Sequence, residues 1–111
     1  MRIAIPVTDD DQVAHGWGRA QQLALVDVTD NQISAWRVVP VGWDVLHDEG
    51  TEGSHHAPVV RFCREQQITD VVVQHMGQGM VNTLTKLGLH LHQTSLPGAR
   101  ESIEALLGSQ A

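Results

Sequence analysis

Two short apolar runs, at residues 2–7 and 71–73, constrain the fold of this chain more than any other feature of its sequence. The first ends at an acidic turn, as expected of a buried central strand. The second shows no alternation of apolar and polar side chains, which is typical of a parallel strand covered on both faces. Sheets that contain such strands need helices on both sides, so the two runs predict an α/β domain.

Three further segments complete the expected sheet. Residues 23–28 and 33–39 are β-rich and are separated by a turn that contains Asp30 and Asn31. These turn residues suit a hairpin, so the two segments are expected to pair antiparallel. Residues 89–94 alternate leucine with histidine, which predicts a strand with one buried face.

Three helices are expected in the second half of the chain. Ser54 can cap the first helix, at residues 54–67, and apolar spacing places a second helix around residues 80–87. Gly88 suits the position just past the end of the second helix. The third helix is expected at about residues 99–107, where the apolar residues again follow helical spacing.

The resulting order, β-β-β-α-β-α-β-α, predicts a three-layer α/β domain on a mixed five-stranded sheet of order 3-2-1-4-5, with strand 2 antiparallel. A length of 111 residues fits a single domain, residues 1–111. In this order the first and fourth strands are neighbours. The connections diverge to opposite sides between their carboxyl ends, which is where open α/β sheets bind ligands.

The composition narrows the classes of partner. Thirteen acidic and seven basic residues give a formal net charge of −6, and no basic stripe is present. This argues against general electrostatic binding of nucleic acid. No segment approaches the roughly 18 apolar residues of a membrane span, and the first apolar run is too short for a signal peptide. We therefore expect a cytoplasmic protein with no membrane partner.

A single cysteine, Cys63, excludes an internal disulfide and a cluster held by several thiolates of one chain. It is expected to pack between a helix and the sheet. Seven histidines remain to be explained. One of them, His47, falls in the irregular segment at residues 40–53, which is expected to be a long surface loop that could close over a ligand.

Three segments are expected to meet at the crevice between the first and fourth strands: the loop after the first strand, the start of the first helix and the end of the fourth strand. They carry histidines that are candidate metal ligands, namely His15, His55, His56 and His75. Beside them lie the candidate cofactor-binding residues, which are Trp17, Arg19, Met76 and Gly77.

These residue types favour a metal or an anionic cluster. Neutral imidazole binds zinc, iron, nickel and copper, and a thioether such as that of Met76 binds copper(I) or a sulfide-rich cluster. The positive end of a helix dipole disfavours protonation of His55 and His56, which leaves their lone pairs available. The same helix end offers N–H donors to an anion, and Arg19 adds a fixed positive charge.

The segments MRIAIPVTDD, LALVDV and ITDVVVQHMG, together with a glycine-arginine-alanine loop and a closing ESIEALL helix, resemble the dinitrogenase iron–molybdenum cofactor biosynthesis family. This small domain is found in NifX and in the carboxyl-terminal part of NifB, and the likeness spans residues 1–107. It implies a ribonuclease H-like fold and a role, related to nitrogen fixation, in binding or carrying metal–sulfur clusters of iron or molybdenum. It also implies that the domain catalyses no reaction of its own.

The resemblance can be followed at two places in the chain. The first loop of the family has a His-Phe-Gly-Arg-Ala type of sequence, whose last four positions match residues 17–20. Gly16 stands where the family has the histidine, and His15 precedes it by one residue. The glycine-rich end of the fourth strand is matched at residues 75–79.

Some of these residues also have purely structural interpretations. Arg19 can pair with Asp9 or Asp27 as part of the scaffold. His90 and His92 are interpreted as the solvent-facing side of a strand, although such a pair can also bind a metal adventitiously. Histidines at the start of a helix are often exposed polar residues.

The favoured hypothesis is a non-catalytic carrier or scaffold for a metal–sulfur cluster, whose partner is a protein that donates or accepts the cluster. A single transition-metal ion is the alternative cargo. Two other functions remain open: a partner-binding module built on Trp43 and the loop at residues 40–53, and a nuclease whose magnesium ions are held by carboxylates at residues 9–11. The metal and the oligomeric state are not specified by the sequence.

Overall fold

The computed structural model describes residues 1–45 and 56–109. Its centre is a five-stranded sheet of order β3-β2-β1-β4-β5. Strand β2 is antiparallel to β1 and β3, whereas β4 is parallel to β1 and β5. The expected order and the antiparallel second strand are therefore confirmed. The strands are β1 (Arg2–Pro6), β2 (Gln22–Thr29), β3 (Gln32–Pro40), β4 (Asp70–Val73) and β5 (His90–Gln93).

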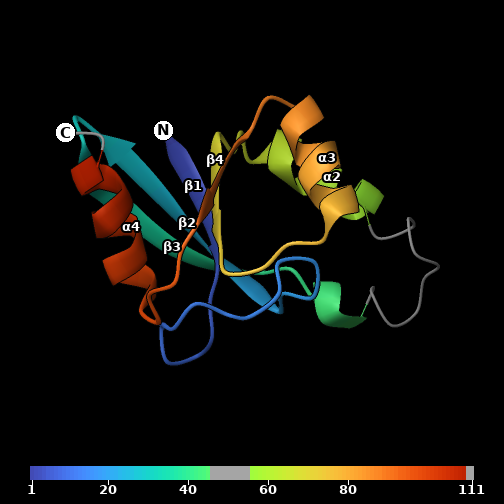
Figure 1. The fold of residues 1–111 in the computed structure, drawn as a ribbon, viewed down its shortest axis with the longest axis horizontal. Coiled ribbons are helices and arrows are strands. Elements are labelled where there is room, and N and C mark those ends of the chain that lie inside the picture. The colour runs from blue at the N-terminus through green and yellow to red at the C-terminus, as the bar shows by residue number, and fades with distance from the viewer. Residues whose placement is uncertain (46–55, 110–111) are drawn as a thin grey trace.

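Helices cover both faces of the sheet, which gives three layers (Figure 1). Helices α2 (His56–Glu65) and α3 (Gln78–Lys86) lie on one face, and α4 (Ala99–Ser109) lies on the other. The expected N-cap of α2, Ser54, falls outside the described residues. No described helix has the length and apolar character needed to cross a membrane.

The expectation of an irregular loop after β3 and of three helices is wrong in one respect, because residues 43–45 are also helical. Trp43 explains this extra turn. Its backbone N–H donates to the carbonyl of Ala20 at 2.9 Å, and its side chain is 3% exposed. A single buried tryptophan thus anchors to the core a segment that has no helical pattern in its sequence.

The central strands are buried on two sides, as their unbroken apolar runs predict. Ala4 and Val71 pack with the residues of α2 and α3, whereas Ile5 and Val72 pack with those of α4. Cys63 on α2 is 2% exposed and belongs to the first of these clusters, so its expected place between helix and sheet is confirmed.

Local backbone conformation explains two of the turns. Asp30 and Asn31 have φ values of 53° and 63°, and two successive positive values form the turn that matches the twist of a hairpin. Both residue types tolerate this conformation. Gly88, directly after the C-cap residue Leu87, has a φ of 85°, as expected for a glycine past a helix end.

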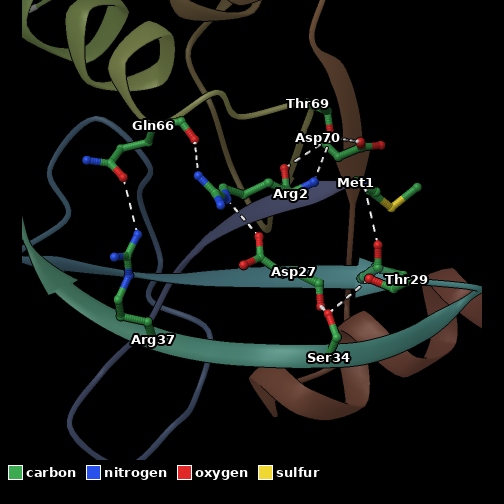
Figure 2. Close-up of polar contacts among 10 residues, drawn as sticks. Met1, Arg2, Asp27, Thr29, Ser34, Arg37, Gln66, Thr69 and Asp70 are labelled. Atoms are coloured by element: carbon green, nitrogen blue, oxygen red, sulfur yellow. Dashed lines mark hydrogen bonds and ion pairs between the residues drawn. The ribbon is translucent and has the colours of Figure 1, made fainter.

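A polar network closes the amino end of the sheet (Figure 2). Arg2 Nε donates to Asp27 Oδ1 at 2.7 Å, and Arg2 Nη1 donates to the carbonyl of Gln66 at 2.6 Å. Arg37 Nη2 donates to Gln66 Oε1 at 3.2 Å. The network joins β1, β2 and β3 to the segment between α2 and β4, so it fixes the sheet at the end opposite the predicted crevice.

Candidate functional site

A cavity of about 380 Å³ lies at the carboxyl ends of β1 and β4. The loop after β1, the start of α2, the end of β4 and the first turn of α3 form its wall. The convergence expected from the sequence therefore occurs in the structure. The expected site residues on this wall are His15, Trp17, Arg19, His56, His75, Met76 and Gly77. The expectations for His47 and His55 fall on residues that the structure does not describe.

The loop after β1 is attached to the end of β4. Gly16 and His75 form a parallel β-bridge, and the N–H of Trp17 donates to the carbonyl of His75 at 3.4 Å. The rings of His15 and His75 stack with centroids 5.7 Å apart and planes inclined by 7°. Both side chains are exposed, so the two imidazoles lie together at an accessible place on the cavity wall.

Trp17 belongs to the core under the cavity. Its side chain is 0% exposed. Its ring makes an edge contact with that of Trp43, and the two ring centroids are 5.2 Å apart. The ring of Trp43 in turn makes an edge contact with that of Phe62 on α2, and these ring centroids are 5.7 Å apart. The indole Nε1 of Trp17 has no acceptor among the described residues. An unsatisfied buried donor costs about 1–3 kcal/mol, and this Nε1 has almost no surface accessible to solvent.

The N-terminus of α3 is the second source of donors. Its N-cap residue, Gly77, has extended backbone angles of φ −66° and ψ 151° and provides no side-chain cap. The first N–H groups of a helix have no partner within the helix, and the residues of this first turn, Gln78 and Gly79, line the cavity. These two residues were not expected at the site, because the apolar pattern of α3 starts later, at Met80.

The N-terminus of α2 reaches the same cavity through His56, which is half-buried. A Cβ added at Gly79 would lie 3.3 Å from Cε1 of His56. The absence of a side chain at Gly79 therefore lets the imidazole lie against the first turn of α3. Two helix N-termini thus contribute their positive dipole ends to one cavity.

The charge of the cavity wall differs from that of the whole chain. The chain has thirteen acidic residues and a formal net charge of −6. The described residues that line the cavity include Arg19 but no aspartate or glutamate. The wall therefore favours an anion over a bare cation.

Protein ligands for a single metal ion are scarce. Within residues 1–45 and 56–109, no three His, Cys, Asp or Glu side chains are grouped so that they could hold a metal ion. Met76 lines the cavity and is half-buried, whereas Met80 is 4% exposed and also belongs to the core cluster. The cavity wall instead provides imidazoles, a thioether and N–H donors.

One polar pair outside the cavity was not expected. His92 was interpreted as solvent-facing, but its Nε2 lies 2.8 Å from Oδ2 of Asp70, which is 3% exposed. The hydroxyl of Thr69 donates to the other carboxylate oxygen of Asp70 at 2.7 Å. The alternation of leucine and histidine in β5 gave the correct strand, but the partner of His92 lies on β4 and follows only from the register of the two strands.

The comparison with known families agrees with this architecture. The dinitrogenase iron–molybdenum cofactor family matches residues 1–109. This chain belongs to that family. The resemblance found in the sequence is therefore confirmed over nearly the whole chain. A comparison with curated proteins gives no match.

Solved structures share the fold of this family member. The crystal structure of PH0822 has a TM-score of 0.77 at 22% identity and covers 98% of this chain and 92% of its own. The Thermotoga protein TM1290, a candidate NifB protein solved by NMR, has a TM-score of 0.76 at 18% identity, and the match covers 98% of this chain and 89% of its own. The apo form of the orange protein from Desulfovibrio gigas also has a TM-score of 0.76 at 18% identity, and the match covers 98% of this chain and 88% of its own. At such identities the likeness concerns the fold alone.

Proposed function

We propose that this member of the dinitrogenase iron–molybdenum cofactor family is a non-catalytic carrier or scaffold for a metal–sulfur cluster that contains iron, molybdenum or both. The observation that carries the proposal is the cavity at the ends of β1 and β4. There, imidazoles from three segments lie on a wall that includes Arg19 and has no carboxylate among its described residues. Metal–sulfur clusters are commonly anionic, and this wall suits an anion with soft, sulfide-rich surfaces.

Each residue on the wall has a part in this proposal. The exposed rings of His15 and His75 and the half-buried ring of His56 supply nitrogen ligands. Met76 supplies a soft thioether next to His75. Arg19 balances negative charge without competing for metal, since a guanidinium has no lone pair to donate. His55 would add a fourth imidazole.

The partner in this proposal is a cytoplasmic protein that donates the cluster or accepts it. Because His15 and His75 are exposed, a cluster held between them is accessible to such a partner. The structure of the orange protein that shares this fold is described as the apo form. By analogy with that protein, we expect empty and loaded states of this chain. The ribonuclease H-like fold implied by the resemblance belongs to the same proposal.

The test is anaerobic reconstitution of the full chain with iron, molybdate and sulfide, followed by measurement of metal and sulfide per chain. We expect His75→Ala and the double variant His55→Ala/His56→Ala to lower cluster affinity about tenfold or more, as loss of ligand-shell contacts does in other metal sites. His90→Ala is the matched control, because His90 is exposed on β5 and does not line the cavity. Equal loading of all four proteins would contradict the ligand assignment. No loading of the unmodified chain would contradict the carrier role.

A further inference from the structure

Strand β3 lies at one edge of the sheet and, among the described residues, pairs only with β2 (Figure 1). It has nine residues, whereas β5 at the other edge has four. An edge strand presents backbone groups that can pair with another chain, and proteins commonly prevent this with short edge strands, charges or prolines. β3 has no lysine, aspartate or glutamate, its one arginine, Arg37, donates to Gln66, and its proline, Pro40, is its last residue. This edge is therefore open to a further strand.

The hydrogen bonds of β2 identify which backbone groups of β3 point outward. The carbonyl of Gln22 accepts from Val7, on the β1 side, at 3.3 Å, whereas the carbonyl of Gln21 accepts from Val41, on the β3 side, at 2.9 Å. Successive residues of an antiparallel strand bond to opposite sides. Residues of β3 that are in step with Val41 therefore bond to β2, and the residues between them point to the outer edge.

Residues 35–40 keep this regular register, because the one register shift in the β2–β3 pair lies nearer the hairpin. Arg37 and Val39 are in step with Val41, so their N–H and C=O groups bond to β2. The N–H and C=O groups of Trp36 and Val38 then point to the outer edge, where the described residues provide no partner strand. The side chain of Val38 is 43% exposed, so this part of the edge is apolar as well as unpaired.

We propose that the outer edge of β3 is a self-association surface, at which the β3 strands of two copies of this chain pair antiparallel about a two-fold axis at Trp36. The two sheets then form one continuous sheet. The outward N–H and C=O groups of Trp36 bond to those of the same residue in the second copy. This inference concerns the assembly of the chain and does not depend on the proposed carrier function.

The charges around the axis favour a second copy as the added strand. In the register that places Trp36 opposite its own copy, Arg37 of each chain faces Ala35 of the second copy, and Asp27 is the neighbour of Ala35 on β2. The side chain of Asp27 is 39% exposed. Each Arg37 therefore has a small side chain opposite it and a carboxylate beyond that side chain. A register centred on Arg37 would place like charges opposite one another, which is destabilising.

This arrangement leaves the cavity of each copy accessible. Strand β3 runs parallel to β1, because both strands are antiparallel to β2. Its carboxyl end therefore lies at the same end of the sheet as the cavity. Antiparallel pairing reverses one copy relative to the other, so the two cavities lie at opposite ends of the joined sheet. None of the residues of β3 lines the cavity.

Amide hydrogen exchange of the metal-free full chain, followed by NMR at low and high protein concentration, measures this pairing residue by residue. A contact through one strand edge is small, so we expect a dissociation constant in the micromolar range. The amides of Trp36 and Val38 should exchange about tenfold or more slowly at high concentration, because they become hydrogen-bonded. The amides of Arg37 and Val39 are the internal controls, since they bond to β2 in both states.

Val38 provides a set of matched variants. Val38→Pro removes an N–H that points away from β2, and proline is tolerated at such positions of edge strands. Val38→Lys changes an exposed side chain and adds a charge of the kind that prevents edge pairing. We expect each of them to raise the dissociation constant of the dimer about tenfold or more. Val38→Thr keeps the N–H and the branched shape, and it should change this constant less than about twofold. Thermal melting of each variant checks that it is folded.

Analytical ultracentrifugation of the unmodified chain and the three variants measures the dissociation constants. A mass that rises with concentration toward that of two chains, together with slower exchange at Trp36 and Val38, supports the inference. The mass of one chain at every concentration up to the millimolar range overturns it, and the edge would then be open only to a strand of another protein. A dimer that forms equally well in Val38→Pro and Val38→Lys also overturns it, because the two copies would then associate through another surface.

Discussion

The environment of Cys63 decides whether this cysteine is a reactive, metal-binding thiolate or a packing residue of the core. It is the single cysteine of the chain and lies in the core between α2 and the sheet, 2% exposed. Burial raises the pKa of its thiol to about 12. Because the thiolate is the form that binds metals and attacks electrophiles, Cys63 is a packing residue in the folded chain.

We therefore expect native Cys63 to react with a disulfide reagent such as DTNB at least tenfold more slowly than the same thiol in denaturant, since labelling requires opening of the core. The raised pKa also predicts a pH effect with a definite sign. The unfolded thiol ionises first as the pH rises, so the stability present below its ordinary pKa is lost progressively toward the folded value of about 12. Denaturation curves at rising alkaline pH measure this loss, and Cys63→Ala should show less of it. Rapid labelling of the native chain would contradict the assignment.

At the same scale, the sequence predicted residue positions better than residue partners. It placed His15, Trp17, Arg19 and His75 at one crevice because the ends of parallel strands meet at one edge of the sheet. It gave no sign that Asp70 is buried against His92. That contact depends on the register between β4 and β5, which no local pattern encodes.

At the level of secondary-structure elements, replacing either of two glycines by alanine should change the free energy of unfolding in opposite directions, because their backbone conformations differ. Gly88 ends α3 with a φ of 85°, which a residue with a Cβ adopts only with strain. Gly108 lies within α4, where an added Cβ would meet no atom within 4 Å. We expect Gly88→Ala to lower the free energy of unfolding by about 1 kcal/mol, and Gly108→Ala to raise it by up to about 0.5 kcal/mol.

Urea denaturation of the two variants checks this pair, and each serves as the control for the other because the same atoms are added. A rise in the free energy of unfolding of Gly88→Ala would contradict the positive φ after the C-cap of α3, and a fall for Gly108→Ala would contradict the open space beside that residue. Neither glycine lines the cavity, so binding of the cargo should be unaffected by both substitutions.

The elements that the sequence predicted well are those with a strong hydrophobic period. Strands β1 and β4 were recognised because both of their faces are buried, and α4 because its apolar side chains follow one stripe. The start of α3 was placed too late, since Gln78 and Gly79 are exposed and carry no apolar pattern. The helical turn at Trp43 was missed because its stability comes from contacts with Trp17 and Phe62, which are distant in sequence.

Across the whole molecule, the two ends of the sheet have different properties. The amino end is closed by the hydrogen bonds of Arg2, Asp27, Arg37 and Gln66 (Figure 2). The carboxyl end contains the cavity, an indole N–H that has no acceptor within residues 1–45 and 56–109, and a helix N-terminus without a side-chain cap. The described part of the carboxyl end therefore keeps hydrogen-bonding capacity without a partner, and this is the end where the proposed cargo binds.

This division predicts that stability and cargo binding can be changed separately. Arg2→Met removes the donor to Asp27 and to the carbonyl of Gln66, and we expect it to lower the free energy of unfolding. The ion-pair part of this loss is small, because the side chains of Arg2 and Asp27 are 32% and 39% exposed and solvent screens them. Cluster loading should equal that of the unmodified chain at temperatures where the variant is folded.

The pH dependence of the stability of Arg2→Met tests whether its lower stability comes from the lost contact between Arg2 and Asp27. The hydrogen bond from Arg2 holds the pKa of Asp27 below its ordinary value. A lowered folded-state pKa gives stability that is present above the ordinary carboxyl pKa and is lost as the pH falls through the folded value. The difference between the unmodified chain and Arg2→Met, measured by urea denaturation, should therefore shrink toward acid pH. If Arg2→Met instead lost cargo affinity while fully folded, the two ends of the sheet would be energetically coupled, and the cavity would depend on the whole sheet and not only on the segments that line it.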